Sequence, residues 1–572
     1  MKFFFKNIYI ILFFLVAFLS PTYSLAKNNE AHYNKKNISN YFLGIVSVNN
    51  ASDEKVFNYL NKVQLLKDKH TKFNIEFLRN LILLEKFDEA VSFSKKIWKE
   101  DEFFFEADLI LGLDFFIKKD YKNSKRHFER LNKISRYNLF FQDFIGNVLL
   151  AWNEAGQKNQ KESIEFLNKV PKPYRHIIKT QRTFLECYFD TGDTELYFEK
   201  LINDEKYNFS RYNFFLVNHL LHKNKNLKAK QIIKISREKH NSNLLLKQTE
   251  VLLLRKENKK IKDFFDCRNT EHSVAEFFYL IANLYSSESD YQLSNFYLKI
   301  SLLFNDRFLS NKALLAENYY FQNKNQMSKK NYNLIKSIGN VYSWYASKNI
   351  SRILLYDKDK EHSVDFLKKE FDLISEPNFE NYYDLANFYK ENEYYKESIK
   401  YYSLALKNVS VDHYLIPKIL DRRGTSYERI GNWEKAEIDL NKSLEILPEQ
   451  AHVLNYLAYT WIDKGINLEK GLKMLEKAAE LKKEDGYIID SLGWAHYVKE
   501  NYIKAEFFLQ KAVELLPLDP IINDHYADAL WMMNKDIQAR YVWKYILSLN
   551  DTEQKLKDNI NKKLIFGISK KL

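Results

Sequence analysis

The sequence predicts an all-α fold, a right-handed solenoid of helical hairpins. The first observation is a repeated pattern: a small residue, an aromatic or aliphatic residue three positions later, and a second small residue nine positions further on. The leading small residues are Gly424, Ala458, Gly493 and Ala527, at successive spacings of 34, 35 and 34 residues. A fixed period of this size indicates stacked helical hairpins. The chain of 572 residues also exceeds the size of a single core, and its 13 Gly and 8 Pro favour a helical protein over a disordered one.

The first 26 residues have the organisation of an export signal. Lys2 and Lys6 precede a charge-free, mostly apolar run over 8–19, and Ser24 and Ala26 place small residues at the −3 and −1 positions of a cleavage site. The run is shorter than the roughly 20 residues that cross a bilayer. We therefore expect cleavage after Ala26, with an uncleaved membrane anchor as the alternative, and a mature chain outside the cytoplasm.

Behind the signal, the repeats become more regular toward the C-terminus. Residues 27–274 are expected to form divergent helical hairpins with drifting periods. Residues 275–416 contain degenerate copies of the pattern, led by Ala282, Ala316 and Ala386. Residues 417–550 contain four well-formed repeats, the second of which has one extra residue in its turn around 466–468. These repeats are expected to begin near Pro417, Ala451, Gly486 and Pro520.

Close packing within each hairpin explains the small residues. Gly493 on a first helix is expected to face Ala505 on the second, and Ala527 to face Ala539, because two helices joined by a short turn approach closely only where side chains are minimal. Pro448 follows a second helix, where the helix must end before the next repeat begins.

The last segment, 551–572, is predicted to be a capping helix. A final repeat needs a polar-backed helix to cover its apolar face. The alternative is a basic amphipathic helix that binds a membrane surface. The predicted apolar face consists of Leu556, Ile560 and Leu564, and the other sides carry Lys555, Lys557, Lys562 and Lys563.

Two strings identify the repeats with a known family. RRGTSYERIGNWEKAEIDLNKSLEILP and DSLGWAHYVKENYIKAEFFLQKAVELLP resemble tetratricopeptide repeats, strongly over 417–550. DSLGWAHY, followed one repeat later by DHYADALW behind a signal peptide, is similar to exported proteobacterial members of that family. The resemblance implies a location in the periplasm or cell envelope of a Gram-negative bacterium and binding of a protein partner. We expect no cofactor and no nucleic-acid partner.

The two cysteines are predicted to be free. Cys187 and Cys267 are 80 residues apart, more than two repeats, and in a solenoid each repeat contacts only its neighbours. We expect two buried thiols, with a disulfide in an oxidising compartment as the alternative. His219 and His222 lie one helical turn apart, but no third ligand is near them in sequence. They are therefore predicted to be solvated surface residues, and no metal site is expected.

Catalytic signatures are absent from the sequence. It contains no glycine-rich phosphate loop, HExxH, GxSxG or CxxC. A peptidoglycan-cleaving enzyme with a helical superstructure is a remote alternative, because the residues after Leu549 are too few for a compact catalytic domain. We predict a protein without enzymatic activity.

The candidate binding residues form a ladder on the first helices of the last four repeats. The fifth, ninth and twelfth positions of such a helix share one face, which lines the inner surface of a solenoid. Short acids or amides there can hold backbone amides or basic groups, and Trp and Tyr supply rigid contact area. A structural role, in which these residues only fix the stacking of neighbouring repeats, is the alternative. The ladder residues are Asp421, Asn455, Tyr459, Asp490, Trp494, Tyr497, Asp524, Asp528 and Trp531.

The sequence as a whole predicts an interaction scaffold of the cell envelope. Its concave groove is expected to bind a protein or an extended peptide during envelope assembly or export. The formal net charge of +13 leaves an alternative, a structural envelope component in peripheral contact with a membrane or an anionic polymer.

Overall fold

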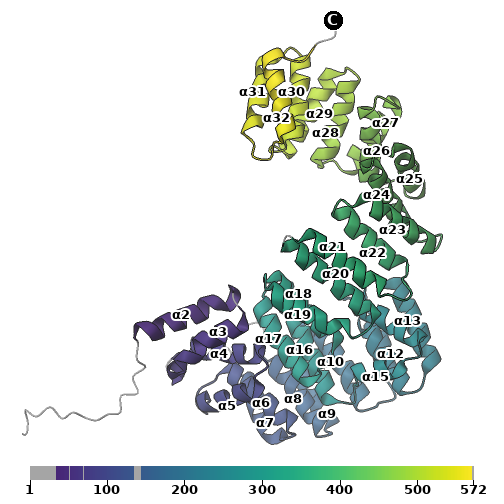
Figure 1. Ribbon diagram of the computed structural model, residues 1–572. Helices are drawn as coiled ribbons and strands as arrows, with labels where there is room; N and C mark the ends of the chain where they lie inside the picture. Colours follow the sequence, from purple (N-terminus) through teal and green to yellow (C-terminus); the bar gives the residue numbers. More distant parts are fainter. Residues whose placement is uncertain (1–33, 51, 69, 134–142, 358, 570–572) are drawn as a thin grey trace, which may run out of the picture. The chain divides into compact units, whose positions relative to one another are not determined.

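The computed structural model describes residues 34–50, 52–68, 70–133, 143–357 and 359–569 (Figure 1). The predicted export signal lies outside these residues. Every regular element within them is a helix, most of them arranged in successive hairpins, which confirms the all-α solenoid. The described chain forms two compact units, one up to Ile353 and the other from Leu354. The predicted boundary at 274/275 lies inside the first unit, and the one at 416/417 lies inside the second. Both predicted boundaries mark where the repeats become more regular, and neither marks the edge of a hydrophobic core.

The first unit contains the divergent repeats. A 3₁₀ helix, η1 (Asn61–Asp68), follows its second helix, and another, η2 (Lys172–Tyr174), precedes α10. Its α-helices are α2 (Lys35–Asn50), α3 (Asp53–Leu60), α4 (Thr71–Leu83), α5 (Phe87–Ile97), α6 (Phe105–Ile117), α7 (Tyr121–Leu131), α8 (Ile145–Gly156), α9 (Gln160–Asn168), α10 (Arg175–Tyr188), α11 (Thr194–Ile202), α12 (Tyr212–His222), α13 (Asn226–Lys239), α14 (Leu244–Leu254), α15 (Asn258–Phe264), α16 (Thr270–Ser287), α17 (Tyr291–Phe304), α18 (Leu309–Phe321), α19 (Asn325–Lys336) and α20 (Asn340–Tyr356).

The turns inside these hairpins share one backbone feature. The residue that reverses the chain after the first helix has a positive φ, as at Asp190 (53°), Asn224 (58°), Ser289 (63°) and Asn323 (58°). Asp190 and Asn224 are 34 positions apart, and so are Ser289 and Asn323. Other turns differ from this spacing, since Asn224 and Lys256 are 32 positions apart, so the divergent half keeps the repeat period only in part. The positive-φ positions of the described first unit are held by residues other than glycine. Glycine adopts this left-handed conformation most easily and would have marked these turns in the sequence.

The first unit also contains contacts between hairpins that are far apart in sequence. Helix α4 packs against α17, and both α8 and α10 pack against α16. Lys299 Nζ pairs with Glu85 Oε1 at 2.5 Å, and the Tyr319 hydroxyl donates to Asp53 Oδ2 at 3.2 Å. The winding of this unit thus brings its early hairpins onto its later ones, so contacts are not restricted to neighbouring repeats.

The second unit contains the regular repeats. Four hairpins begin at Ile416, Ala451, Gly486 and Pro520, within one residue of the predicted starts. The helices of this unit are α21 (Lys360–Asp372), α22 (Phe379–Glu391), α23 (Tyr395–Asn408), α24 (Ile416–Arg429), α25 (Trp433–Ile446), α26 (Ala451–Asp463), α27 (Leu468–Leu481), α28 (Gly486–Val498), α29 (Tyr502–Leu515), α30 (Pro520–Met532), α31 (Asp536–Ser548) and α32 (Gln554–Phe566).

Close helix approach accounts for the leading small residue of these repeats. A Cβ on Gly493 would lie 2.6 Å from Leu509 Cγ, and one on Gly424 would lie 3.2 Å from the Ala436 carbonyl oxygen. Ala505, the residue predicted to face Gly493, is fully buried in the same hairpin, one turn before Leu509. Any side chain at Gly493 would therefore push the two helices of its hairpin apart.

The extra residue predicted in the second repeat is confirmed. The turn between α26 and α27 contains two residues of positive φ, Gly465 (68°) and Asn467 (49°), where the turn between α28 and α29 has only Glu500 (61°). Asn467 is the N-cap of α27, so the insertion lengthens the turn and leaves both helices intact.

None of the helices in the described ranges is long and apolar enough to span a membrane.

Candidate functional site

The predicted ladder lies on α24, α26, α28 and α30, the first helices of four successive hairpins. Helix α26 packs against α28, and α28 against α30. The Tyr456 hydroxyl on α26 donates to Glu428 Oε2 on α24 at 2.7 Å, so these first helices form a continuous series. The ladder residues differ in their partners from the first repeat to the last.

The two N-terminal ladder residues each have an oxygen without a donor. Asp421 Oδ1 and Asn455 Oδ1 have no hydrogen-bond partner among the described residues, and both side chains are only partly buried. Burial raises the pKa of the Asp421 carboxyl, against the opposing effect of nearby His452. An acceptor that has lost water and found no donor is energetically costly, by about 1–3 kcal/mol. These two buried oxygens are therefore unsatisfied acceptors on the ladder face.

The middle of the ladder is an aromatic stack beside a buried ion pair. Trp494 lies parallel to Tyr497 at 4.6 Å and to His525 at 4.1 Å between ring centroids. His525 Nδ1 is 2.9 Å from Asp490 Oδ1, which links α30 to α28. Asp490 and His525 are buried, whereas Trp494 and Tyr497 are half-buried.

His525 is charged more readily than an ordinary histidine. Burial opposes its charged form, but the Asp490 carboxylate outweighs that effect and raises the pKa of His525 above its usual value. Tyr459, also half-buried, has its pKa raised to about 12 by burial and by the neighbouring Asp490 and Asp463 carboxylates. At neutral pH Tyr459 is thus a neutral hydroxyl, available as a donor or an acceptor.

The C-terminal end of the ladder is occupied by the chain's own last helix. Lys563 Nζ on α32 contacts Asp524 Oδ1 at 2.8 Å and both Asp528 carboxylate oxygens at 2.7 Å. Trp531 Nε1 donates to the Ile568 carbonyl at 2.9 Å, and Trp531 is buried. The prediction that Lys563 lies on an outer side of the cap was therefore wrong: its side chain is largely buried, and its ammonium is paired with two carboxylates.

The rest of the cap helix packs as its apolar pattern predicts. Ile560 is fully buried, and Leu556 and Leu564 pack against the same cluster around Trp543 of α31. This helix covers the apolar end of the last hairpin.

The ladder thus divides between the two roles considered for it. Asp490 stacks repeats through His525, and Asp524, Asp528 and Trp531 bind the cap, so these four residues are already engaged within the chain. Asp421 and Asn455 have an unpaired oxygen. The candidate binding face is therefore the stretch over α24, α26 and α28. It contains the two unpaired oxygens and the half-buried side chains of Tyr459, Trp494 and Tyr497.

Sequence reasoning missed two residues of this site. His525 directly follows the fifth position of its repeat, and its place in the string DHYADALW, beside an acid, is the only signal that would have pointed to it. Lys563 lies beyond the last repeat, and no pattern within the helix connects it to Asp524, 39 residues earlier.

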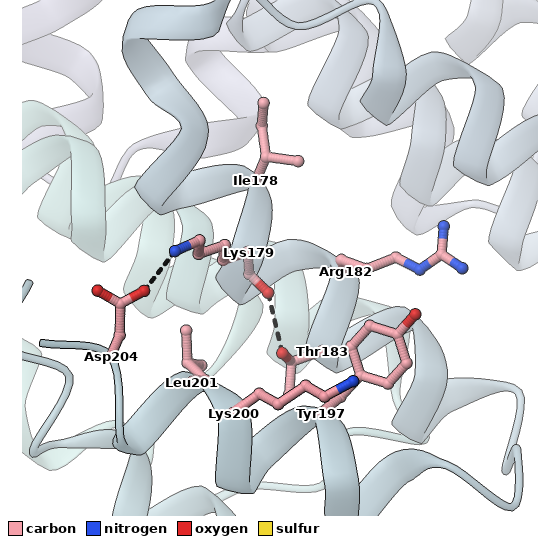
Figure 2. Close-up of a pocket in the computed structure, with 8 residues that line it drawn as sticks. All are labelled: Ile178, Lys179, Arg182, Thr183, Tyr197, Lys200, Leu201 and Asp204. Carbon is pink, nitrogen blue, oxygen red and sulfur yellow. Dashed lines mark hydrogen bonds and ion pairs between the residues drawn. The ribbon is translucent and has the colours of Figure 1, made fainter. Parts of the chain in front are cut away.

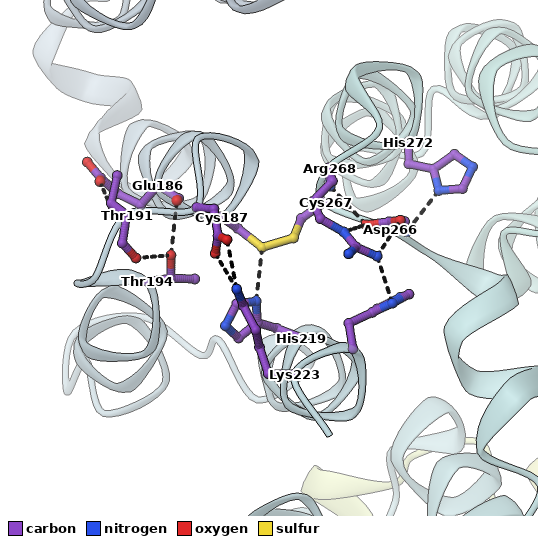
Figure 3. The surroundings of a disulfide bond; sticks show 12 residues. Glu186, Cys187, Thr191, Thr194, His219, Lys223, Asp266, Cys267, Arg268 and His272 are labelled. Carbon is purple, nitrogen blue, oxygen red and sulfur yellow. Dashed lines mark hydrogen bonds and ion pairs between the residues drawn. A yellow bond between two sulfur atoms is a disulfide. The ribbon is translucent and has the colours of Figure 1, made fainter. Parts of the chain in front are cut away.

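The cysteine prediction was also wrong. Cys187, near the end of α10, and Cys267, in the loop between α15 and α16, form a disulfide with a Cα–Cα distance of 5.8 Å (Figure 3). Hairpins more than one repeat apart meet in the first unit, since α10 packs against α16, and the neighbour-only rule does not hold there. His219 on α12 is buried, not solvated, and its Nδ1 lies 3.3 Å from Cys187 Sγ. The donor types of a metal site are therefore present although the sequence showed no third ligand.

A second candidate site is a pocket of about 420 Å³ between α10 and α11 (Figure 2). Two of its basic side chains are engaged: Lys179 pairs with Asp204, and Arg182 Nε donates to Glu186 Oε1 at 2.6 Å. The remaining surface is largely apolar, so no convergent set of polar groups defines a ligand. The lining consists of Ile178, Lys179, Arg182, Thr183, Tyr197, Lys200, Leu201 and Asp204.

Comparison with known proteins gives short alignments to curated sequences. No protein-family profile matches the chain. It is 29% identical over 99 residues to the TPR repeat-containing protein PA4667 of Pseudomonas aeruginosa. This alignment covers 17% of each chain. It is 28% identical over 187 residues to a UDP-N-acetylglucosamine–peptide N-acetylglucosaminyltransferase of Giardia intestinalis. This alignment covers 32% of this chain and 11% of that protein. The chain therefore spans less than a fifth of the length of either relative.

Solved structures with similar helical repeats include yeast Tom70, at 16% identity and a TM-score of 0.33, with 79% of this chain and 94% of that one covered. A tetratricopeptide repeat protein from Parabacteroides merdae is 20% identical with a TM-score of 0.34 and covers 39% of this chain and 88% of its own. YrrB, described as a TPR protein with an unusual peptide-binding site, is 21% identical with a TM-score of 0.25 and covers 30% of this chain and 86% of its own.

Proposed function

We propose that this chain of tetratricopeptide-type repeats is a non-enzymatic scaffold that binds an extended segment of a protein partner on the ladder face of α24, α26 and α28. The observation that carries the proposal is the pair of unpaired acceptors, Asp421 Oδ1 and Asn455 Oδ1. They lie on successive first helices of the series that continues to the Trp494–Tyr497 stack.

The chemistry of the face favours a ligand that brings donors. Backbone N–H groups of an extended peptide, or a lysine or arginine side chain, would satisfy the two oxygens, and the half-buried Tyr459 and Trp494 would supply contact area. The chain itself provides an example of this recognition, because Lys563 occupies the equivalent carboxylates Asp524 and Asp528 one repeat beyond Trp494. A basic segment is therefore the favoured ligand.

We propose that the protein is located in the cell envelope. The N-terminal pattern around Ala26 supports export, and the Cys187–Cys267 disulfide supports an oxidising compartment, where such bonds persist. Membrane contact through the basic cap has less support, because the apolar face of α32 and Lys563 are packed against the last hairpin. Contact of the wider basic surface with a membrane or an anionic polymer stays the alternative. Mass spectrometry of the mature protein is expected to find Lys27 as the first residue; an uncleaved N-terminus would contradict the export signal.

The binding face can be tested by site-specific crosslinking. A photoreactive phenylalanine analogue at Tyr459 is expected to give discrete protein adducts when cells are irradiated. The control is the same analogue at Phe507, which is 65% exposed on the second helix α29 and lies outside the ladder. The crosslinked partner segment, made as a peptide, then gives an affinity by titration.

The double substitution Asp421→Ala/Asn455→Ala removes both unpaired acceptors. Each hydrogen bond contributes about 1 kcal/mol, so the pair should weaken peptide binding by roughly 30-fold. Adducts that form equally at Tyr459 and Phe507, or an affinity that the double substitution leaves unchanged in a folded protein, would exclude binding at this face.

A further inference from the structure

A buried disulfide and a histidine imidazole lie together in the first unit, and the proposed binding face does not use them. Cys187 on α10, His219 on α12 and Cys267 before α16 come from three segments of the chain and are all buried (Figure 3). The ligand atoms of the three residues lie within 4.8 Å of one another. His219 Nδ1 faces Cys187 Sγ at 3.3 Å.

These donors have the chemistry of a thiophilic metal site. Two thiolates and one imidazole suit zinc, which is bound by sulfur at about 2.3 Å and by nitrogen at about 2.0 Å in tetrahedral geometry. Two sulfurs on such an ion are roughly 3.7 Å apart, so opening the disulfide requires each sulfur to move by only about 1 Å. A fourth ligand need not come from the chain, because zinc sites with three protein ligands take a water.

The surroundings allow a cation despite two basic neighbours. Lys223 pairs with Asp190 Oδ1 at 2.6 Å, and Arg268 Nε pairs with Asp266 Oδ1 at 2.9 Å, so each positive charge is balanced locally. A neutral imidazole has the lone pair that a metal ligand needs.

We propose that the reduced form of this protein binds one zinc ion through Cys187 Sγ, Cys267 Sγ and His219 Nδ1. A dithiol reductant supplies two electrons and two protons: the S–S bond breaks, two S–H groups form, and the dithiol becomes a disulfide. Zinc then displaces both thiol protons and binds the two thiolates. The ion replaces the disulfide as the cross-link between α10 and the loop before α16. It also links α12 to both, through His219.

The experiment uses the full chain, unfolded in denaturant with a dithiol and refolded without oxygen in the presence of zinc. After dialysis, elemental analysis is expected to find one zinc per chain in the reduced protein and none in the disulfide form. Cobalt in place of zinc should give the charge-transfer absorption of a thiolate–cobalt bond. Zinc affinity is then measured by competition with a chromophoric chelator.

Two histidine variants separate ligation from packing. His219→Gln should lower zinc affinity by about tenfold or more, the size of effect seen even for outer-shell changes, and should still form the disulfide on oxidative refolding. His222→Gln, one helical turn away, is the matched control and should bind zinc like the wild type. The proposal is wrong if the reduced wild type holds no more zinc than Cys187→Ser/Cys267→Ser, or if His219→Gln binds as tightly as His222→Gln. In either case the cysteines serve only as a disulfide clamp.

Discussion

Replacing Lys563 by methionine removes an ammonium that two buried carboxylates share. The side chains of Lys563, Asp524 and Asp528 are 13%, 10% and 9% exposed. Water can therefore replace little of the interaction that the two carboxylates lose with the ammonium. Breaking a buried ion pair by removing one partner costs about 3–5 kcal/mol. We expect about 3 kcal/mol at pH 8, the lower end of this range, because a carboxyl can relieve part of the repulsion by taking up a proton.

The same contact makes the cost depend on pH. Burial and the neighbouring Asp524 raise the pKa of Asp528 from its ordinary 3.8 to about 6, even with Lys563 present. A group whose pKa is raised on folding contributes stability that is fully present below its unfolded pKa and is lost as the pH rises through the folded value. Without Lys563 the pKa of Asp528 should rise further, so Lys563→Met should cost less at pH 5 than at pH 8.

Hydrogen exchange measures this loss locally, which suits a chain of many repeats that need not unfold in one step. A loss of about 3 kcal/mol corresponds to more than a hundredfold faster exchange of protected amides in α30 and α32, after correction for intrinsic rates. Lys562→Met, at the exposed neighbouring position, is the control and should leave protection unchanged. Adding Asp528→Asn to Lys563→Met should restore most of the protection. Equal protection in the Lys563 and Lys562 variants at pH 8, or a loss that does not change with pH, would refute this account.

Two further predictions concern other buried charges. Because the pKa of His525 is raised, its pairing with Asp490 should stabilise the protein below pH about 6.5 and weaken as the pH rises through the folded pKa. The fluorescence of Trp494, obtained by subtracting the spectrum of Trp494→Phe, should change with pH as the stacked His525 titrates. The midpoint of this change should move to lower pH in Asp490→Asn, and an unchanged midpoint would contradict the pairing. In the first unit, Arg211→Met removes the basic partner of the fully buried Glu276 carboxylate, leaving it the Tyr212 hydroxyl, and should lower the free energy of unfolding by about 3–5 kcal/mol. Adding Glu276→Leu should recover most of that loss in denaturant titrations, and a double variant as unstable as the single one would show that the ion pair is not the cause.

The repeat architecture was predictable because its signals are local. A small residue recurring at 34 or 35 positions fixes where two helices of a hairpin approach, and the observed contact of Gly493 with Leu509 follows from that. The apolar face of the cap helix was predictable for the same reason, since Ile560 and Leu564 follow the helical period. Patterns of this kind need no information on how distant segments meet.

The divergent half was harder to divide into repeats for a physical reason. Its turns use residues such as Asp190, Asn224 and Ser289 at positive φ, where glycine would have given a visible signal. A single left-handed residue costs only about 1–2 kcal/mol, which the packing of a hairpin easily offsets, so selection need not place glycine there. The backbone turns keep the 34-residue spacing only in part, so neither they nor the side chains mark a regular period.

The ladder and the cysteines show where sequence reasoning stops. The sequence by itself determined that the chain is a helical-hairpin solenoid and which face of each first helix carries the polar and aromatic residues. Only the tertiary structure decided which of those residues are engaged, because Lys563 reaches Asp528 from beyond the last repeat and Cys267 meets Cys187 across more than two hairpins. The physical reason is that superhelical winding adds small rotations over many repeats, and the segments that finally meet depend on their sum and not on any local pattern.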